Sequence, residues 1–167
     1  LKALAKRAVA LDPTLAPEAT RIALEKAGAK IIEAQDPCVL PKARKNPTEQ
    51  QGAREAQRRD GAALSEFLHW LDREAISGKE TELTAANELL RCRQATGLLR
   101  DLSFESISAA GPNAASPHYH LTLGEERNIN PGEIYLIDSG GQYVDGTTDV
   151  TRTVMIGTPT AEKIGRA

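Results

Sequence analysis

The strongest constraint on the fold lies in residues 134–149. Four consecutive apolar residues, 134–137, run directly into Asp138, and Asp149 follows eleven residues later. A continuous apolar run of this kind is typical of a strand that is buried on both faces. Gly140-Gly141, between the two aspartates, predicts a turn that folds the chain back. We therefore expect a hairpin in which the two carboxylates converge.

A carboxylate at the end of a buried strand is poorly hydrated, so it has to be paired, hydrogen-bonded or bound to a metal. Asp149 shares a strand face with the small polar residues Thr151 and Thr153. Two carboxylates beside hydroxyls suit a hard or borderline divalent cation such as Mn²⁺, Co²⁺ or Zn²⁺. Two simpler interpretations stay open: Asp138 caps a turn, and Asp149 pairs with Arg152 or ends a solvated strand.

Histidines offer a second candidate group. His118, in Pro117-His118-Tyr119-His120, precedes the hairpin and can shuttle a proton or orient a substrate near neutral pH. A lone histidine is more often a structural hydrogen-bonding residue, so this alternative also stays open. Asp145-Gly146 has the composition of a turn and is given no catalytic role.

Prolines divide the chain. Pro37, Pro41 and Pro47 fall within eleven residues, which predicts a linker and a domain boundary. Before them, a helix that opens at Pro17-Glu18 and stops at Gly28 is followed by a strand over 30–34. We interpret 1–40 as the end of a non-catalytic α/β domain, 41–46 as a linker and 47–167 as a second domain.

The second domain begins with a strong helix start. Asn46 is a suitable N-cap, Pro47 occupies the first helical position, and Glu49 completes a start resembling a capping box. The spacing predicts a helix to about Ala75, broken at Gly78. Its expected apolar face consists of Ala53, Ala56, Ala63, Leu64, Phe67, Leu68 and Leu71.

After the long helix, the sequence predicts a second helix and then a sheet. Thr81 can cap a helix that stops at Gly97. Strands are expected over 104–108, 133–138, 142–144 and 150–156. Two helices followed by an antiparallel sheet indicate the α+β class, with the helices on one face.

Composition excludes several function classes. The net charge is −2, and no basic run forms a patch that would bind nucleic acid. No apolar run approaches the roughly 20 residues that cross a membrane, so no membrane association is expected. The nucleophile-elbow, P-loop and dinucleotide-binding motifs are missing from the sequence. Cys38 and Cys92 show no paired spacing, which favours reduced thiols and a cytoplasmic protein.

Several stretches together resemble aminopeptidase P, the Xaa-Pro aminopeptidases of the pita-bread metallopeptidase family. The longest of them runs from Asp138 to Thr153 and contains both aspartates. The resemblance covers nearly the whole chain and is closest to the three-domain form of the family. The other stretches that carry it are 45–49, 58–61, 67–72, 102–108, 110–113, 118–119 and 131–133.

The resemblance implies an activity and a site. In this family two aspartates, a histidine and two glutamates hold two divalent metals, commonly manganese, with zinc or cobalt as alternatives. Asp138 and Asp149 match the two aspartates, and His118 matches a histidine that contacts the substrate near the scissile bond. A metal-bound hydroxide attacks the Xaa-Pro bond of peptides with proline in second position. A homodimer is expected for the complete enzyme.

The resemblance also has limits. Only eighteen residues follow Asp149, with no histidine and a single glutamate, Glu162, at the wrong place. The chain also begins with Leu1 rather than Met. We therefore expect a partial chain that holds the first half of the pita-bread catalytic domain and is inactive by itself.

A second departure lies at 114–117, where Pro117 replaces a β-branched residue before His118. Proline removes a strand donor there and could misplace the imidazole. Two alternative functions remain. One is a non-catalytic pita-bread module that binds peptides or proteins, and the other is a prolidase-type dipeptidase.

Overall fold

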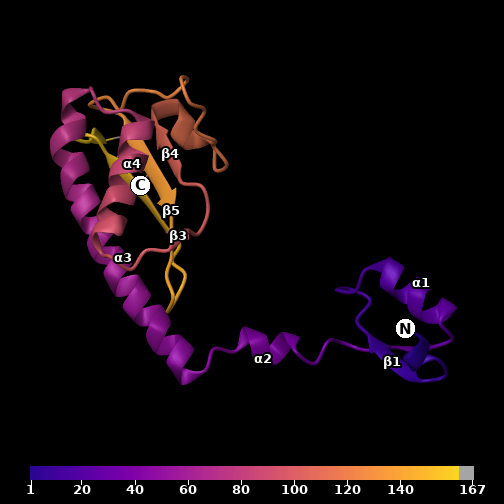
Figure 1. Cartoon of the computed structure of the whole chain (residues 1–167). Helices are drawn as coiled ribbons and strands as arrows, with labels where there is room; N and C mark the ends of the chain where they lie inside the picture. The colour runs from indigo at the N-terminus through magenta and orange to yellow at the C-terminus, as the bar shows by residue number, and fades with distance from the viewer. Residues whose placement is uncertain (162–167) are drawn as a thin grey trace. The chain divides into compact units, whose positions relative to one another are not determined.

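The structure is a computed structural model that describes residues 1–161 (Figure 1). The chain forms two compact units, Leu1–Asn46 and Pro47–Ala167. Each unit forms its own β-sheet structure and is described separately.

The first unit is a small βαβ arrangement. In chain order its elements are η1 (Lys2–Leu4), β1 (Ala8–Leu11), α1 (Glu18–Lys26), β2 (Lys30–Glu33) and α2 (Val39–Ala43). The strands β1 and β2 are parallel, with Val9 opposite Ile31. The predicted helix and strand are confirmed, and Gly28 takes the left-handed conformation (φ 81°) just after α1. β1, which sequence reasoning left unassigned, exists because β2 supplies its partner.

Helix α2 overlaps the segment that was expected to be a linker. It covers Val39–Ala43, so residues 41–43 of the expected linker are helical. Pro41 is tolerated because it sits in the first turn, where its missing N–H has no intrahelical acceptor. The amide of Lys42 donates to the Cys38 carbonyl at 3.0 Å, which closes this short helix.

The second unit opens with two helices that pack against each other (Figure 1). α3 covers Pro47–Glu74, continues as η2 (Ala75–Ser77) and ends at Gly78, which has φ 69°. α4 covers Glu82–Ala95. The predicted Thr81 cap is confirmed, because its hydroxyl accepts from the Thr84 amide at 3.2 Å and a reciprocal bond completes a capping box.

Antiparallel strands form the rest of this unit. They are β3 (Asp101–Leu102), β4 (Ile107–Ala110), β5 (Ile134–Ser139), β6 (Gly141–Gln142) and β7 (Val150–Met155), with the 3-10 turn η3 (Gly111–Ala115) after β4. The strands β4, β5 and β7 form one sheet in that order, and β3 pairs with β6. The strand expected over 104–108 begins later, at Ile107, where pairing with β5 starts.

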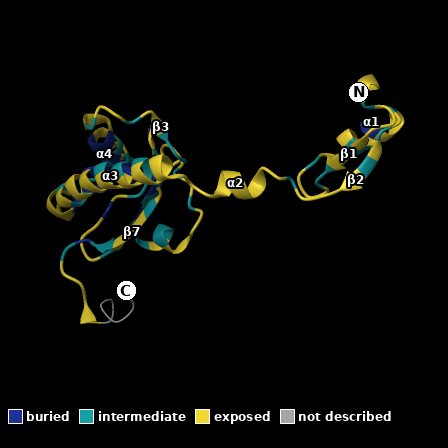
Figure 2. Ribbon diagram, turned by 90° about the horizontal axis from the view of Figure 1, so that it is seen from below, coloured by how far each residue is buried: buried dark blue, intermediate teal, exposed yellow. Residues whose placement is uncertain are grey.

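The core lies between the two helices and one face of the sheet (Figure 2). Phe67 and Tyr135 are fully buried there. The arrangement confirms the α+β class and the placement of helices on one face. The core cluster consists of Ala63, Leu64, Phe67, Leu71, Ala75, Ala85, Leu89, Cys92, Ala110, Ile129, Tyr135, Ile137 and Ile156.

The hairpin from β5 to β7 keeps one register throughout. Ser139 pairs with Val150, and a bridge joins Gln142 to Thr147 further out. The chain reverses at 144–145, where the amide of Tyr143 donates to the Gly146 carbonyl at 2.9 Å. Asp145-Gly146 is therefore at the turn, as expected.

Gly140-Gly141 forms part of the hairpin arm, so the turn predicted there was placed wrongly. A side chain at Gly140 would collide with the Thr148 carbonyl oxygen and the Ser103 hydroxyl. Glycine is needed at this position for close backbone approach, which sequence reasoning cannot distinguish from a turn.

Candidate metal centre

Asp138 and Asp149 lie on the two arms of one hairpin. Asp138 is in β5 and pairs with Thr151 of β7. The same register places Asp149, which directly precedes β7, opposite Gly140. Since alternate residues of a strand share a face, Asp149 lies on the face of Thr151 and Asp138. Such diagonal neighbours on two paired strands are about 7–8 Å apart through space, so their side chains can reach a shared cation.

One oxygen of Asp138 is enclosed without a partner. Asp138 is half-buried, and its Oδ1 atom is buried with no hydrogen-bond donor. Within residues 1–161, the Nε atom of Arg127 is the other buried side-chain polar atom of this kind. An unsatisfied buried acceptor costs about 1–3 kcal/mol, and more when it is charged. The orphaned oxygen therefore fits a cation ligand better than a turn cap.

Asp149 is exposed to solvent. Arg152 donates to the Thr151 carbonyl at 2.8 Å, and in the described part of the chain it forms no ion pair with Asp149. The hydroxyls of Thr151 and Thr153 lie on the same strand face as the two carboxylates, on the side away from the core. This all-oxygen environment fits a hard or borderline divalent cation.

Within residues 1–161, the candidate metal ligands that the hairpin brings together are Asp138 and Asp149. No group of three or more His, Cys, Asp or Glu side chains within 1–161 is arranged to hold a metal. Glu162 lies outside the described residues.

His118 belongs to a different segment from the two aspartates. It is exposed and sits in a turn after η3, where the Tyr119 amide donates to the Ser116 carbonyl at 3.2 Å. Pro117 is in this turn and not in a strand, so its missing N–H removes no strand hydrogen bond. Within residues 1–161 no hydrogen bond or ion pair joins His118 to Asp138 or Asp149. Its role at an active site remains a prediction.

A buried ion pair supports β5 on the core side of Asp138. The Arg93 guanidinium donates to both Asp60 oxygens, at 2.8 Å and 3.1 Å, with 0% and 2% of the side chains exposed. Arg93 also donates to the hydroxyl of Ser139, the residue after Asp138. The Tyr143 hydroxyl donates to Asp60 at 2.7 Å, and burial, with Asp60 as a further cause, raises the pKa of Tyr143. This network joins both helices to the hairpin.

Sequence reasoning missed this network, although one signal was present. Asp60 lies at helical spacing from Ala56 and Leu64, so it falls on the apolar face of α3. A charged residue on such a face indicates a buried partner. Nothing local identifies Arg93 as that partner, because the two residues are 33 apart in the chain.

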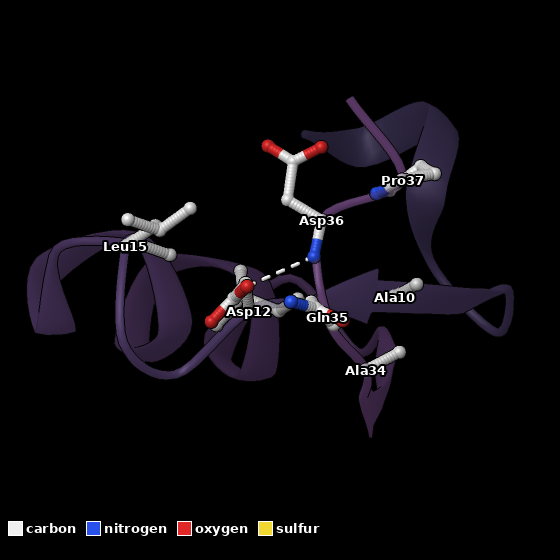
Figure 3. Close-up of a pocket in the computed structure, with 9 residues that line it drawn as sticks. Ala10, Asp12, Leu15, Ala34, Gln35, Asp36 and Pro37 are labelled. Carbon is white, nitrogen blue, oxygen red and sulfur yellow. Dashed lines mark hydrogen bonds between the residues drawn. The ribbon is translucent and has the colours of Figure 1, made fainter. Parts of the chain in front are cut away.

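The first unit contains a cavity of about 360 Å³ at the ends of β1 and β2 (Figure 3). The carboxylates of this cavity accept hydrogen bonds from nearby backbone amides. Asp12 accepts from the Thr14 hydroxyl and amide and from the Asp36 amide, and these hydrogen bonds lower the pKa of Asp12. Asp36 accepts from the Cys38 amide at 2.8 Å. Since these acidic groups are already engaged, the cavity shows no built ligand site.

Two further expectations concern membrane-spanning helices and the two cysteines. No helix in residues 1–161 is long and apolar enough to cross a membrane. Cys38 is exposed and Cys92 is buried, and both are free thiols.

Comparisons by sequence and by structure both find proteins whose names describe peptidases of Xaa-Pro bonds. A protein of Talaromyces marneffei named probable Xaa-Pro aminopeptidase P is 52% identical over 104 residues, which are 61% of this chain and 16% of that protein. A similarly named protein of Aspergillus flavus is 50% identical over 104 residues. The part of the chain that matches therefore spans less than a fifth of the length of these relatives.

Solved structures show the fold. The X-prolyl aminopeptidase of Caenorhabditis elegans, described as a cytosolic enzyme with a di-nuclear active site, matches with a TM-score of 0.73 and 42% identity. The match covers 80% of this chain and 22% of that one. The Xaa-Pro dipeptidase of Bacillus anthracis matches with a TM-score of 0.73 and 23% identity over 93% of this chain and 42% of that one. The fold is thus the α+β pita-bread fold, of which this chain spans a part.

The sequence of residues 51–166 matches metallopeptidase family M24. This range is more than half of the chain and includes both aspartates of the hairpin. The resemblance seen in the sequence is confirmed, and the chain belongs to metallopeptidase family M24.

Proposed function

We propose that this chain is part of a metal-dependent aminopeptidase that hydrolyses the N-terminal Xaa-Pro bond of peptides. The observation that carries the proposal is the pair Asp138 and Asp149 on one face of a hairpin, with a buried Asp138 oxygen that has no protein partner. The names of the most similar relatives support the same activity.

The proposed ligands have distinct positions. Asp138 would hold a cation from the enclosed side, and Asp149 from the solvent side of the hairpin. Two divalent metals held there, with manganese as the first expectation, would supply a hydroxide at neutral pH and would polarise the scissile carbonyl. His118 would contact the substrate near the scissile bond. The buried Arg93–Asp60 pair would hold the end of β5, next to Asp138, in place from the core side.

Further parts of the proposal concern the complete protein. We expect a cytoplasmic homodimer that acts on peptides with proline in second position. Cytoplasmic location is supported by the two free thiols and by the cytosolic description of the Caenorhabditis elegans enzyme. Within residues 1–161 the proposed metal ligands are Asp138 and Asp149, so we expect weak metal binding and no turnover from this chain alone.

The test compares two aspartates of the same hairpin. Asp149→Ala should remove turnover of an Xaa-Pro-Yaa peptide by the complete protein and reduce its bound manganese, measured by elemental analysis. Asp145→Asn is the matched control, because Asp145 lies at the turn and pairs with Arg59. It should keep both metal content and turnover. Unchanged activity in Asp149→Ala would refute the proposed mechanism.

Substrate length separates this activity from its alternatives. Cleavage of Xaa-Pro dipeptides with no cleavage of tripeptides would indicate a prolidase-type enzyme. Peptide binding without hydrolysis at full metal loading would indicate a binding module.

A further inference from the structure

Glu82 is a buried carboxylate that the proposed mechanism does not use. It is the first residue of α4, a position where an acidic side chain is usually solvated, and yet 0% of it is exposed. An ion buried in this way is stable only when hydrogen bonds and charge compensate for lost hydration. Its place at the positive end of α4 supplies part of that compensation.

Four donors surround the Glu82 carboxylate. Oε1 accepts from the Ala110 amide at 2.7 Å and from the Asn113 side-chain amide at 2.9 Å. Oε2 accepts from the Tyr119 hydroxyl at 2.8 Å and from the Arg127 amide at 3.0 Å. An ionised carboxylate is an acceptor only and has room for about four donors, so the set is complete.

All four donors belong to the segment that carries His118. Ala110 ends β4, Asn113 lies in η3, Tyr119 follows His118 directly, and Arg127 ends the irregular stretch before the core residue Ile129. Between η3 and Arg127 the chain forms turns and no helix or strand. The Glu82 carboxylate thus joins both ends and the middle of residues 110–127 to helix α4.

The chemistry of these contacts requires a carboxylate. Glutamine has nearly the same shape, but its amide nitrogen would face two donors in place of accepting from them. Burial, together with the Glu82 carboxylate, raises the pKa of Tyr119 to about 12. The Tyr119 hydroxyl therefore stays protonated and remains a donor at neutral pH. The backbone of Glu82 is held as well, because its carbonyl accepts from the Ser108 hydroxyl at 2.6 Å.

We propose that Glu82 is a positioning residue that holds segment 110–127, and with it the His118 imidazole, in one place against α4. The anchoring stands on the contacts above, whereas its consequence for catalysis rests on the proposed function, in which His118 contacts the substrate.

Hydrogen–deuterium exchange of the chain tests the anchoring without requiring activity. Glu82→Gln should speed amide exchange in 110–127 at least about tenfold, since opening of a segment becomes easier when its hydrogen bonds are lost. Tyr119→Phe should give a smaller, local increase. Leu89→Ala is the control: Leu89 is buried on the same helix, and its truncation should raise exchange across the whole core. The anchoring is wrong if Glu82→Gln leaves 110–127 unchanged or speeds all regions equally, as Leu89→Ala does.

Kinetics of the complete protein test the consequence for catalysis. Glu82→Gln should lower kcat/KM for an Xaa-Pro-Yaa peptide about tenfold or more, but should have little further effect in a His118→Ala background. An equal loss in both backgrounds would overturn positioning through His118. If His118→Ala itself keeps full turnover while exchange in 110–127 still rises in Glu82→Gln, the substrate role of His118 fails and the anchoring stands.

Discussion

Removal of Arg93 should be among the most destabilising single changes in the second unit. The Arg93 and Asp60 side chains are almost fully buried, and each carries a charge that the other compensates. In Arg93→Met, Asp60 keeps the Tyr143 hydroxyl as a donor but loses both guanidinium bonds. Breaking one partner of a buried pair costs about 3–5 kcal/mol.

This cost can be converted into a melting temperature. The unit Pro47–Ala167 has about 120 residues, and unfolding entropy is about 2.1 cal/mol/K per residue. The entropy of the unit is then about 0.25 kcal/mol/K, so Arg93→Met should lower Tm by about 12–20 °C. Denaturant titration should show the same loss as a lower midpoint.

Trp70 provides the assay. It is the one tryptophan of the chain, and it stacks on the core residue Phe67 with ring centroids 6.0 Å apart. Its fluorescence therefore reports on the second unit. The double variant Asp60→Leu/Arg93→Met leaves no uncompensated charge and should recover most of the loss, which a double-mutant cycle would register as strong coupling. A loss below about 1 kcal/mol in Arg93→Met, or additive effects in the cycle, would refute the reasoning.

Two further predictions concern side chains whose pKa is shifted in the folded chain. A hydrogen bond from the Arg59 guanidinium lowers the pKa of Asp145 in the folded chain. The Asp145–Arg59 pair therefore stabilises the fold at pH values above the pKa of Asp145 in the unfolded chain. This stabilisation is lost as the pH falls through the pKa of Asp145 in the folded chain. Arg59→Gln should remove this acid-dependent step from the stability profile, and an unchanged profile would contradict the assignment. Burial, with the Glu66 and Glu88 charges, raises the pKa of Cys92 to about 11, so at pH 8 a thiol reagent should modify Cys38 rapidly and Cys92 only after unfolding. Rapid modification of two thiols in the folded protein would show that Cys92 is accessible.

Local features of the sequence correctly predicted most elements. The boundaries of α3 follow from Pro47 and Gly78, and the start of α4 follows from Thr81. These signals work because a helix end depends on the dihedral angles and hydrogen bonds of the few residues around it. The apolar run into Asp138 and the glycines after it likewise predicted a hairpin, which the strand register confirms, although its turn lies at 144–145 and not at Gly140-Gly141.

Other features depend on residues that are far apart in the chain. Gly140 resembles a turn residue locally, but its neighbour in space is the Thr148 carbonyl. Glu82 resembles a solvated residue of a helix start, and only the return of residues 110–127 over α4 buries it. Sequence patterns report on neighbours within about one helical turn or one strand pair. They therefore cannot show contacts between residues that are far apart in the chain.

The sequence by itself therefore determined most of the helices and strands and the hairpin that carries the two aspartates, because periodicity and capping act over a few residues, whereas β1 and α2 were not predicted. Only the tertiary structure decided which polar groups are buried and what they contact. The Asp60–Arg93 pair and the Glu82 anchor each join segments about 30 residues or more apart. These contacts form only when both segments pack together, because the water-excluding interior that strengthens them does not exist in either segment alone.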